Sequence, residues 1–297
     1  LLRIDDPNIE LNLQGSINIS GKENVANLIA EVRNFNPSAL KLSNQWPETA
    51  FSFNIDADIS GRSLNKSKGE VVVSDFLMDS PKQQYYLEQL NIRADENNGV
   101  HLLDIESDFA RVSIVGDYDY ETLPQSFINI IGKRLPTLPG LPDVTNTNSN
   151  DFIIDATLNN TDWLKAFFNI PLDLKSPLHI EGDINDANSS MNMNVVVPDF
   201  VYDDTNFKAT NINISTPNDT LRMKARIDKY NDMGQLTSLM LSTDAINDKF
   251  NANTKFSIDG MVTLKGNLDL YAKFYQDDNG ADAAYVSIQP SELVVND

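Results

Sequence analysis

The sequence contains no cysteine and only two histidines among its 297 residues. Without cysteine, the chain can form no disulfide, no thiolate metal site and no thiol nucleophile. The histidines, His101 and His179, lie beside apolar residues in alternating segments, and two histidines alone are poor material for a transition-metal site. Phosphate-binding glycine loops and the nucleophile motif G-x-S-x-G are also absent. We therefore expect neither an enzyme nor a bound metal or organic cofactor.

Positive charge and long apolar runs are also scarce. The 43 acidic side chains outnumber the 23 basic ones, which gives a formal charge of −20. This sign argues against nucleic acid and anionic lipid headgroups as electrostatic partners. No apolar run is long enough to span a membrane, and the start, LLRIDDPNIELNL, already alternates instead of resembling a signal peptide. We expect an excised segment of a longer protein, whose membrane anchor lies outside this chain.

Strand-like alternation dominates the sequence that is present. Apolar residues hold one parity across 9–19, 51–59 and 256–274, with Asn, Asp, Ser and Lys between them. This period of two predicts strands with one apolar and one polar face. Turn signals such as Asn97-Asn98-Gly99 and Asp277-Asp278-Asn279-Gly280 predict hairpins, and the second lacks the spacing of a calcium loop.

Glycines inside the predicted strands and a few helical segments complete the fold prediction. Gly15, Gly182, Gly260 and Gly266 allow a sheet to bend sharply. Helical spacing marks 124–135 and 161–168, with Thr161 as a helix N-cap, and 36–42 occupies an equivalent place upstream. The predicted fold is mainly β, a long curved antiparallel sheet in the form of a U-shaped trough, with a few short helices.

One stretch of the sequence occurs in two similar copies. Residues 51–94 and 178–216 share IDADI/IEGDI, VVVSDF/VVVPDF and LNIRA/INIST at offsets of 125, 124 and 122. Tandem units of this kind indicate a repetitive scaffold. We predict a first helix-plus-meander unit over 1–135, a Pro/Asn-rich joint over 136–150 and a second unit over 151–297, with a continuous sheet.

These repeated strands, short helices and Pro-rich joint resemble the TamB/AsmA-like family of envelope proteins. The matching segments are IELNLQGSINIS (9–20), FNIDADISGRSLNKSKGEVVVSDF (53–76), IESDFARVSIVGDYDY (105–120), IEGDIND (180–186) and VVVPDF (195–200). The second copy departs from the pattern at DANSS (186–190), which predicts a different turn there.

The resemblance implies an interior β-taco segment of a translocation and assembly module subunit in the periplasm, inner-membrane anchored in the full-length protein. Its hydrophobic groove would carry phospholipid acyl chains between the inner and outer membranes, with an outer-membrane barrel assembly protein as partner. The residues expected to line the groove are Ile9, Leu11, Leu13, Phe53, Ile55, Val71, Val73, Ile92, Ile105, Ile180, Val195, Val197, Ile212, Ile214, Ile258, Val262, Leu264, Leu268, Leu270 and Phe274.

Two other functions compete with the lipid conduit. Exposed sheet edges could template partner strands by β-augmentation, which would make the protein a scaffold or chaperone for outer-membrane protein insertion. A carbohydrate-active or adhesive β-solenoid would need an exposed aromatic platform or paired acids in a cleft, and no clear candidate stands out. Trp163 and Phe167, on the predicted helix 161–168, are expected to cap the apolar face, with a ligand gate as the sharper alternative.

Overall fold

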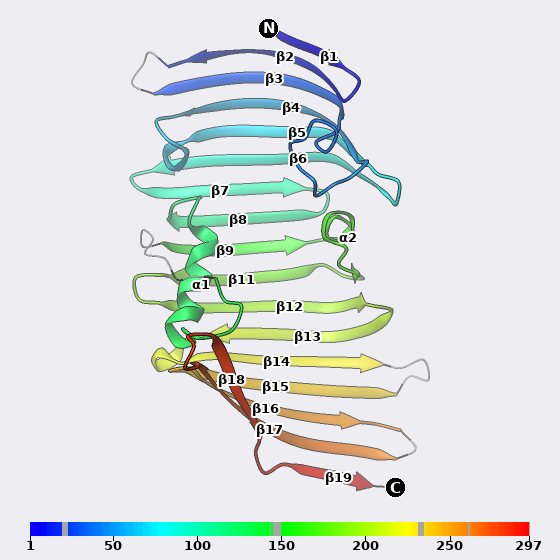
Figure 1. The fold of residues 1–297 in the computed structure, drawn as a ribbon, viewed down its shortest axis with the longest axis vertical. Coiled ribbons are helices and arrows are strands. Elements are labelled where there is room, and N and C mark those ends of the chain that lie inside the picture. Colours follow the sequence, from blue (N-terminus) through cyan, green and yellow to red (C-terminus); the bar gives the residue numbers. More distant parts are fainter. Residues whose placement is uncertain (20–22, 143, 145–149, 231–234, 261, 297) are drawn as a thin grey trace. The chain divides into compact units, whose positions relative to one another are not determined.

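The computed structural model describes residues 1–297 except 20–22, 143, 145–149, 231–234, 261 and 297. Within the described part the chain forms nineteen strands and two α-helices, and neighbouring strands run antiparallel (Figure 1). The prediction of a mainly β, antiparallel fold with a few helices is therefore confirmed. Contacts divide the chain into an N-terminal unit, Leu1–Val115 with Leu158–Leu172, and a C-terminal unit, Gly116–Thr157 with Asp173–Asp297.

The two predicted units were defined differently, by the repeat in the sequence, and their boundaries at 135 and 151 stay a prediction. Much of the proposed joint, at 143 and 145–149, lies outside the described residues.

The N-terminal unit is a meander of strands with one helix. Its strands are β1 (Leu2–Asp6), β2 (Ile9–Asn18), β3 (Asn24–Phe35), β4 (Ala50–Gly61), β5 (Lys68–Asp79), β6 (Gln84–Asn97), β7 (Val100–Ser107) and β8 (Ala110–Asp117), the last of which ends just past the boundary. A short 3₁₀ helix, Leu64–Lys66, joins β4 to β5, and α2 (Asp162–Phe168) returns to this unit from further along the chain.

Strand register separates apolar from polar side chains on this sheet. Side chains that lie opposite one another across strands share a face. One such row from β2 to β6 is Leu13, Ala30, Ile55, Val73 and Leu90, and a second from β3 to β7 is Leu28, Ala57, Val71, Ile92 and Ile105. The row directly beside the first, on the opposite face, is Asn12, Glu31, Asn54, Ser74 and Gln89. The alternation in the sequence thus becomes one apolar and one polar face.

The C-terminal unit repeats this arrangement. It contains α1 (Leu123–Arg134), β9 (Asp151–Leu158), β10 (Leu172–Leu174), β11 (Leu178–Asn185), β12 (Ser190–Tyr202), β13 (Thr205–Ser215), β14 (Leu221–Tyr230), β15 (Leu236–Ile246), β16 (Lys249–Ile258), β17 (Thr263–Gln276), β18 (Asp282–Ile288) and β19 (Glu292–Asn296).

Its rows are longer than those of the N-terminal unit. From β11 to β17 one face carries Ile180, Val195, Ile212, Ala225, Leu241, Thr254 and Leu268. The adjacent row on the opposite face carries Glu181, Asn194, Asn213, Lys224, Ser242, Asn253 and Asp269. One face of the sheet therefore carries a row that is apolar at six of seven positions, and the opposite face carries an adjacent row that is wholly polar.

The predicted helices meet different outcomes. Those at 124–135 and 161–168 are confirmed as α1 and α2, whereas the helix expected at 36–42 is wrong. That segment forms turns, in which Asn36 O accepts a hydrogen bond from Leu40 N at 3.1 Å, and it ends with Lys41 at a left-handed φ of 59°. Thr161 precedes α2 but makes no side-chain cap, because its Oγ1 donates to Leu172 O at 2.6 Å.

The strand predicted over 256–274 is also corrected. The chain reverses between Ile258, where β16 ends, and Thr263, where β17 begins, so that Gly260 lies outside the strands. The two halves pair with each other, and Phe256 lies opposite Gly266. A Cβ atom added to Gly266 would lie 2.2 Å from the Phe256 ring, so this glycine makes room for an aromatic side chain on the apolar face.

Both predicted turns are confirmed. Asn98 and Gly99 connect β6 to β7 with φ angles of 53° and 84°. Between β17 and β18, Asp277 Oδ1 accepts hydrogen bonds from the backbone N–H groups of Asn279 and Ala281 at 2.8 and 2.9 Å. These bonds favour the ionised carboxylate and lower the pKa of Asp277. This carboxylate therefore organises a hairpin turn.

The sequence repeat corresponds to equivalent strands in the two units. The first copy covers β4, β5 and β6, and the second covers β11, β12 and β13. Ile55 pairs with Val73, but its counterpart Ile180 pairs with Val195 instead of Val197, which is a shift of two residues. Because side chains alternate with a period of two, this shift keeps every apolar residue on its face. The turn at 186–189 replaces the 3₁₀ helix Leu64–Lys66, as the departure at DANSS predicted.

Candidate functional site: an apolar pocket in the N-terminal unit

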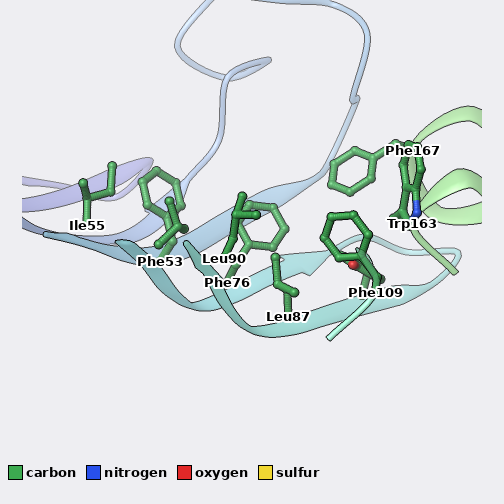
Figure 2. Close-up of a pocket in the computed structure, with 10 residues that line it drawn as sticks. Phe53, Ile55, Phe76, Leu87, Leu90, Phe109, Trp163 and Phe167 are labelled. Carbon is green, nitrogen blue, oxygen red and sulfur yellow. The ribbon is translucent and has the colours of Figure 1, made fainter. Parts of the chain in front are cut away.

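The apolar face of the N-terminal unit carries a pocket of about 380 Å³. It lies over β4, β5 and β6, and the loop between β7 and β8 and α2 form the wall at one end (Figure 2). Ten side chains line it: Phe53, Ile55, Val73, Phe76, Tyr85, Leu87, Leu90, Phe109, Trp163 and Phe167. The Tyr85 hydroxyl and the Trp163 indole nitrogen are the only polar side-chain atoms of this lining, so the pocket suits an apolar guest.

A β-bulge at Asp75 creates the pocket by changing which side chains face it. Asp75 adopts a left-handed φ of 51°, and the register between β4 and β5 shifts at this point. As a result Val73 and Phe76, three residues apart, both line the pocket. Asn54 Nδ2 donates to Asp75 Oδ2 at 2.9 Å and holds the bulge on the polar face.

Aromatic rings connect the sheet to α2. The Phe76 ring centroid lies 6.1 Å from those of Phe51, Phe53 and Phe167 and 6.3 Å from that of Tyr85. Phe167 in turn lies 5.7 Å from Tyr85 in an edge-to-face arrangement. Aromatic pairs at these distances contribute beyond their buried area. The cluster therefore holds α2 at one end of the pocket.

Polar contacts fix the C-terminal end of α2. The Gln83 side chain, from the turn between β5 and β6, donates to the carbonyl oxygens of Lys165 at 3.3 Å and Ala166 at 2.9 Å. Asn169, at a left-handed φ of 56°, donates its N–H to Lys165 O at 3.1 Å. These bonds satisfy carbonyl groups that a helix end leaves free. The C-terminal end of α2 is thus held both by the turn between β5 and β6 and by the residue that follows the helix.

The pocket lining is uncharged at physiological pH. Burial raises the pKa of Tyr85 to about 12, and the carboxylates of Asp108 and Asp162 add to the increase. The hydroxyl therefore stays protonated.

Beyond the Phe167 side chain lies a second cavity of about 670 Å³, which has a mixed lining that includes Glu48, Lys82 and Lys165.

Most of the predicted groove residues do lie on the apolar faces, and three of them line the pocket. Phe53, Ile55 and Val73 belong to the pocket, and Ile9, Leu11, Leu13, Val71, Ile92 and Ile105 lie on the face around it. In the C-terminal unit Ile180, Val195, Val197, Ile212, Ile214, Leu264, Leu268, Leu270 and Phe274 share the parity of the apolar face. Ile258 is 39% exposed, and Val262, at 45%, lies outside the strands. Their assignment to a lipid groove stays a prediction.

The prediction missed the residues that complete the pocket. Phe76, Tyr85, Leu87, Leu90 and Phe109 were not among the predicted groove residues, and Trp163 and Phe167 were expected only to cap the apolar face. Ser74-Asp75, which interrupts the apolar run 71–78, was the available signal, because a polar pair inside such a run is typical of a bulge.

In the described part of the chain, no three Asp, Glu or His side chains are grouped so that they could hold a metal ion. His101 Nε2 lies 2.7 Å from Asn65 O, and His179 Nδ1 lies 3.0 Å from Thr157 Oγ1. Both histidines thus contact neighbouring loops or strands. No helix in the described ranges has the length and apolarity needed to cross a membrane.

The fold and the pocket define a class of protein: an antiparallel β-sheet protein whose strands carry one apolar face, with an aromatic-walled pocket on it. The chain matches no family model, no curated protein and no solved structure.

Proposed function

We propose that this chain is a non-enzymatic, lipid-carrying segment of a periplasm-spanning envelope protein of the TamB/AsmA-like type, and that phospholipid acyl chains move along its apolar faces between the inner and outer membranes. The observation that carries the proposal is the composition of the cross-strand rows. In the N-terminal unit Val71, Ile92 and Ile105 lie side by side on one face. All three are only half-buried.

A half-buried apolar face needs a partner. Apolar area that stays in contact with water costs free energy in proportion to its extent, and acyl chains would cover it without requiring hydrogen bonds. The polar rows on the opposite face keep that side hydrated. The net charge of −20 repels anionic headgroups. A phospholipid would therefore be held through its acyl chains and not through its headgroup.

A charge on the apolar face tests this function. We expect Ile92→Asp to slow phospholipid transfer between donor and acceptor vesicles by about tenfold, because an acyl chain would have to pass a carboxylate. Asn91→Asp is the matched control, since it introduces the same charge on the same strand but on the polar face. Transfer would be followed by dequenching of a fluorescent phospholipid, with circular dichroism to verify folding. Equal rates for both variants and the unmodified chain would refute the proposal.

A specific observation favours a second candidate function. β18 and β19, both of which pair with β17, carry large exposed apolar side chains: Tyr285, Val286, Ile288, Leu293, Val294 and Val295. Such strands are suited to β-augmentation by an outer-membrane protein client. A photoreactive residue at Val286 would trap the client under this alternative, whereas crosslinks to lipid at Ile92 alone would favour the conduit.

A further inference from the structure

A groove on the polar face of the C-terminal unit is lined by cations and by no anion. This basic groove has a volume of about 480 Å³ and lies over β13 to β16, where Lys224, Arg226 and Lys255 line it. All three side chains are exposed. No Asp or Glu of the described residues lines the groove. Its charge is therefore opposite to that of the whole chain, in which 43 acidic residues outnumber 23 basic ones.

Strand register explains how the groove forms. Arg226 on β14 lies opposite Met240 on β15, which lies opposite Lys255 on β16. Lys224 is two residues from Arg226 and so shares its face. Because neighbouring strands lie about 4.8 Å apart, the basic residues of β14 and β16 are about 10 Å apart across β15. Between them β15 places only the uncharged Met240 and Ser242. An anion above β15 is therefore within reach of long basic side chains from both sides.

The carboxylates that share this face are engaged by neighbouring residues. Each accepts a hydrogen bond: Asp228 from Ser238 at 2.7 Å and Arg226 at 3.2 Å, Asp244 from Arg222 at 2.7 Å, and Asp269 from Asn253 at 2.6 Å. Lys224 and Lys255 form no ion pair with any residue that the structure describes. Like charges on one face of a sheet repel and destabilise it. A bound anion would offset this repulsion.

The cations favour a phosphate group as the anion. The planar guanidinium of Arg226 suits two phosphate oxygens at once, and the lysines add point charges. A phosphate monoester carries nearly two negative charges at neutral pH and three acceptor oxygens. Because salt screens charges beyond about 8 Å at physiological ionic strength, the groove's own charges outweigh the net charge of the chain. At roughly 30 Å³ for each water-sized group, the groove has room for about sixteen such groups, enough for a phosphate with a small organic substituent.

We propose that the basic groove binds a phosphate monoester, whose oxygens accept hydrogen bonds from Arg226, Lys224, Lys255 and the Ser242 hydroxyl. This site goes beyond the proposed lipid conduit, because it lies on the polar face of the sheet and not on the apolar one. The recognised chemistry is shared by small organic phosphates and by the headgroup of phosphatidic acid.

Calorimetric titration of the whole chain with glycerol 3-phosphate tests the site. We expect saturable binding that Lys255→Gln weakens about tenfold, because a charged hydrogen bond is lost. Lys249→Gln is the matched control: it removes the same charge from the same strand and face, six residues away and outside the groove lining, and should leave the affinity unchanged. Succinate, a dianion without phosphate, should bind about tenfold more weakly than glycerol 3-phosphate.

Flotation with phosphatidylcholine vesicles, with and without phosphatidic acid, distinguishes the two sources of the phosphate. Flotation only with phosphatidic acid identifies a lipid headgroup, and binding of glycerol 3-phosphate without flotation identifies a small organic phosphate. The proposal is overturned if glycerol 3-phosphate does not bind saturably, if both lysine variants weaken it equally, or if succinate binds as tightly. It is also overturned if the chain forms a dimer that Lys255→Gln abolishes and phosphate does not bind, since the groove would then dock an acidic surface of a second copy.

Discussion

Replacing Asp219 with asparagine is expected to lower the free energy of unfolding of the C-terminal unit by about 2 kcal/mol. The reason is Arg134, whose side chain on α1 is only 2% exposed. Its guanidinium donates to Asp219 Oδ1 at 2.9 Å, to Asp219 O at 3.2 Å and to Ile130 O at 3.0 Å. Burial lowers the pKa of Arg134 and Asp219 opposes this change, but a guanidinium stays charged at any ordinary pH. Without the carboxylate, the buried guanidinium keeps its hydrogen bonds to two backbone carbonyl oxygens but loses its negatively charged partner.

This ion pair belongs to a series of contacts along one side of the unit. Asn129 Nδ2 donates to Asp186 Oδ2 at 3.3 Å, and the backbone N–H of Thr137 donates to Asp248 Oδ1 at 3.0 Å. Asp186, Asp219 and Asp248 lie in the turns of the hairpins β11–β12, β13–β14 and β15–β16. The segment around α1 thus joins successive hairpins, and we expect Asp219→Asn to raise amide exchange at all of these turns.

Urea unfolding followed by circular dichroism and hydrogen exchange of peptides that cover 123–135 would measure the effect. Asp204→Asn is the control: it makes the same change in a hairpin turn, at a similar left-handed φ of 59°, where asparagine is favoured. A loss as large for Asp204→Asn would contradict the argument. The double variant Arg134→Met with Asp219→Asn should recover part of the stability, since it removes the unpaired charge.

Replacing Phe76 with alanine is expected to destabilise the N-terminal unit by about 3 kcal/mol and to widen its pocket. Phe76 contacts the rings of Phe51, Phe53, Tyr85 and Phe167, so its loss removes one of the ring contacts that hold α2 against the sheet. Both tryptophans, Trp46 and Trp163, lie in this unit. Tryptophan fluorescence during urea unfolding therefore reports on it selectively.

The repeat supplies the matched control. Phe200 is the counterpart of Phe76 in VVVPDF, and it stacks on Phe207 with a centroid distance of 5.0 Å. Phe200→Ala removes the same side chain from an equivalent strand without removing a ring contact to a helix, and we expect a smaller loss of stability and unchanged tryptophan fluorescence. If the two variants destabilise the chain equally, the aromatic cluster adds nothing to simple burial.

Local rules explain how much of the fold could be predicted. The period of two at 9–19 and 178–184 predicted strands with one apolar face because side chains alternate wherever a strand is extended. Helical spacing in 124–135 and 161–168 predicted α1 and α2 for the same reason, since period follows from backbone geometry. The helix at 36–42 was wrong because its few apolar residues did not outweigh a turn that ends in a left-handed Lys41.

The candidate site was less predictable, because it depends on interruptions of those rules. Alternation places Val71 and Val73 on one face and would send Phe76 to the other. The bulge at Asp75 reverses this assignment. Trp163 and Phe167 reach the pocket from more than fifty residues beyond the loop that carries Phe109, a separation that no local pattern encodes.

By itself, the sequence determined that this is an antiparallel β protein with one apolar and one polar face, because both properties follow from the order of side chains along extended strands. Only the tertiary structure decided where the apolar face becomes a pocket. Side chains that are far apart in the chain set the register of neighbouring strands, the bulge and the docking of α2 by packing against one another.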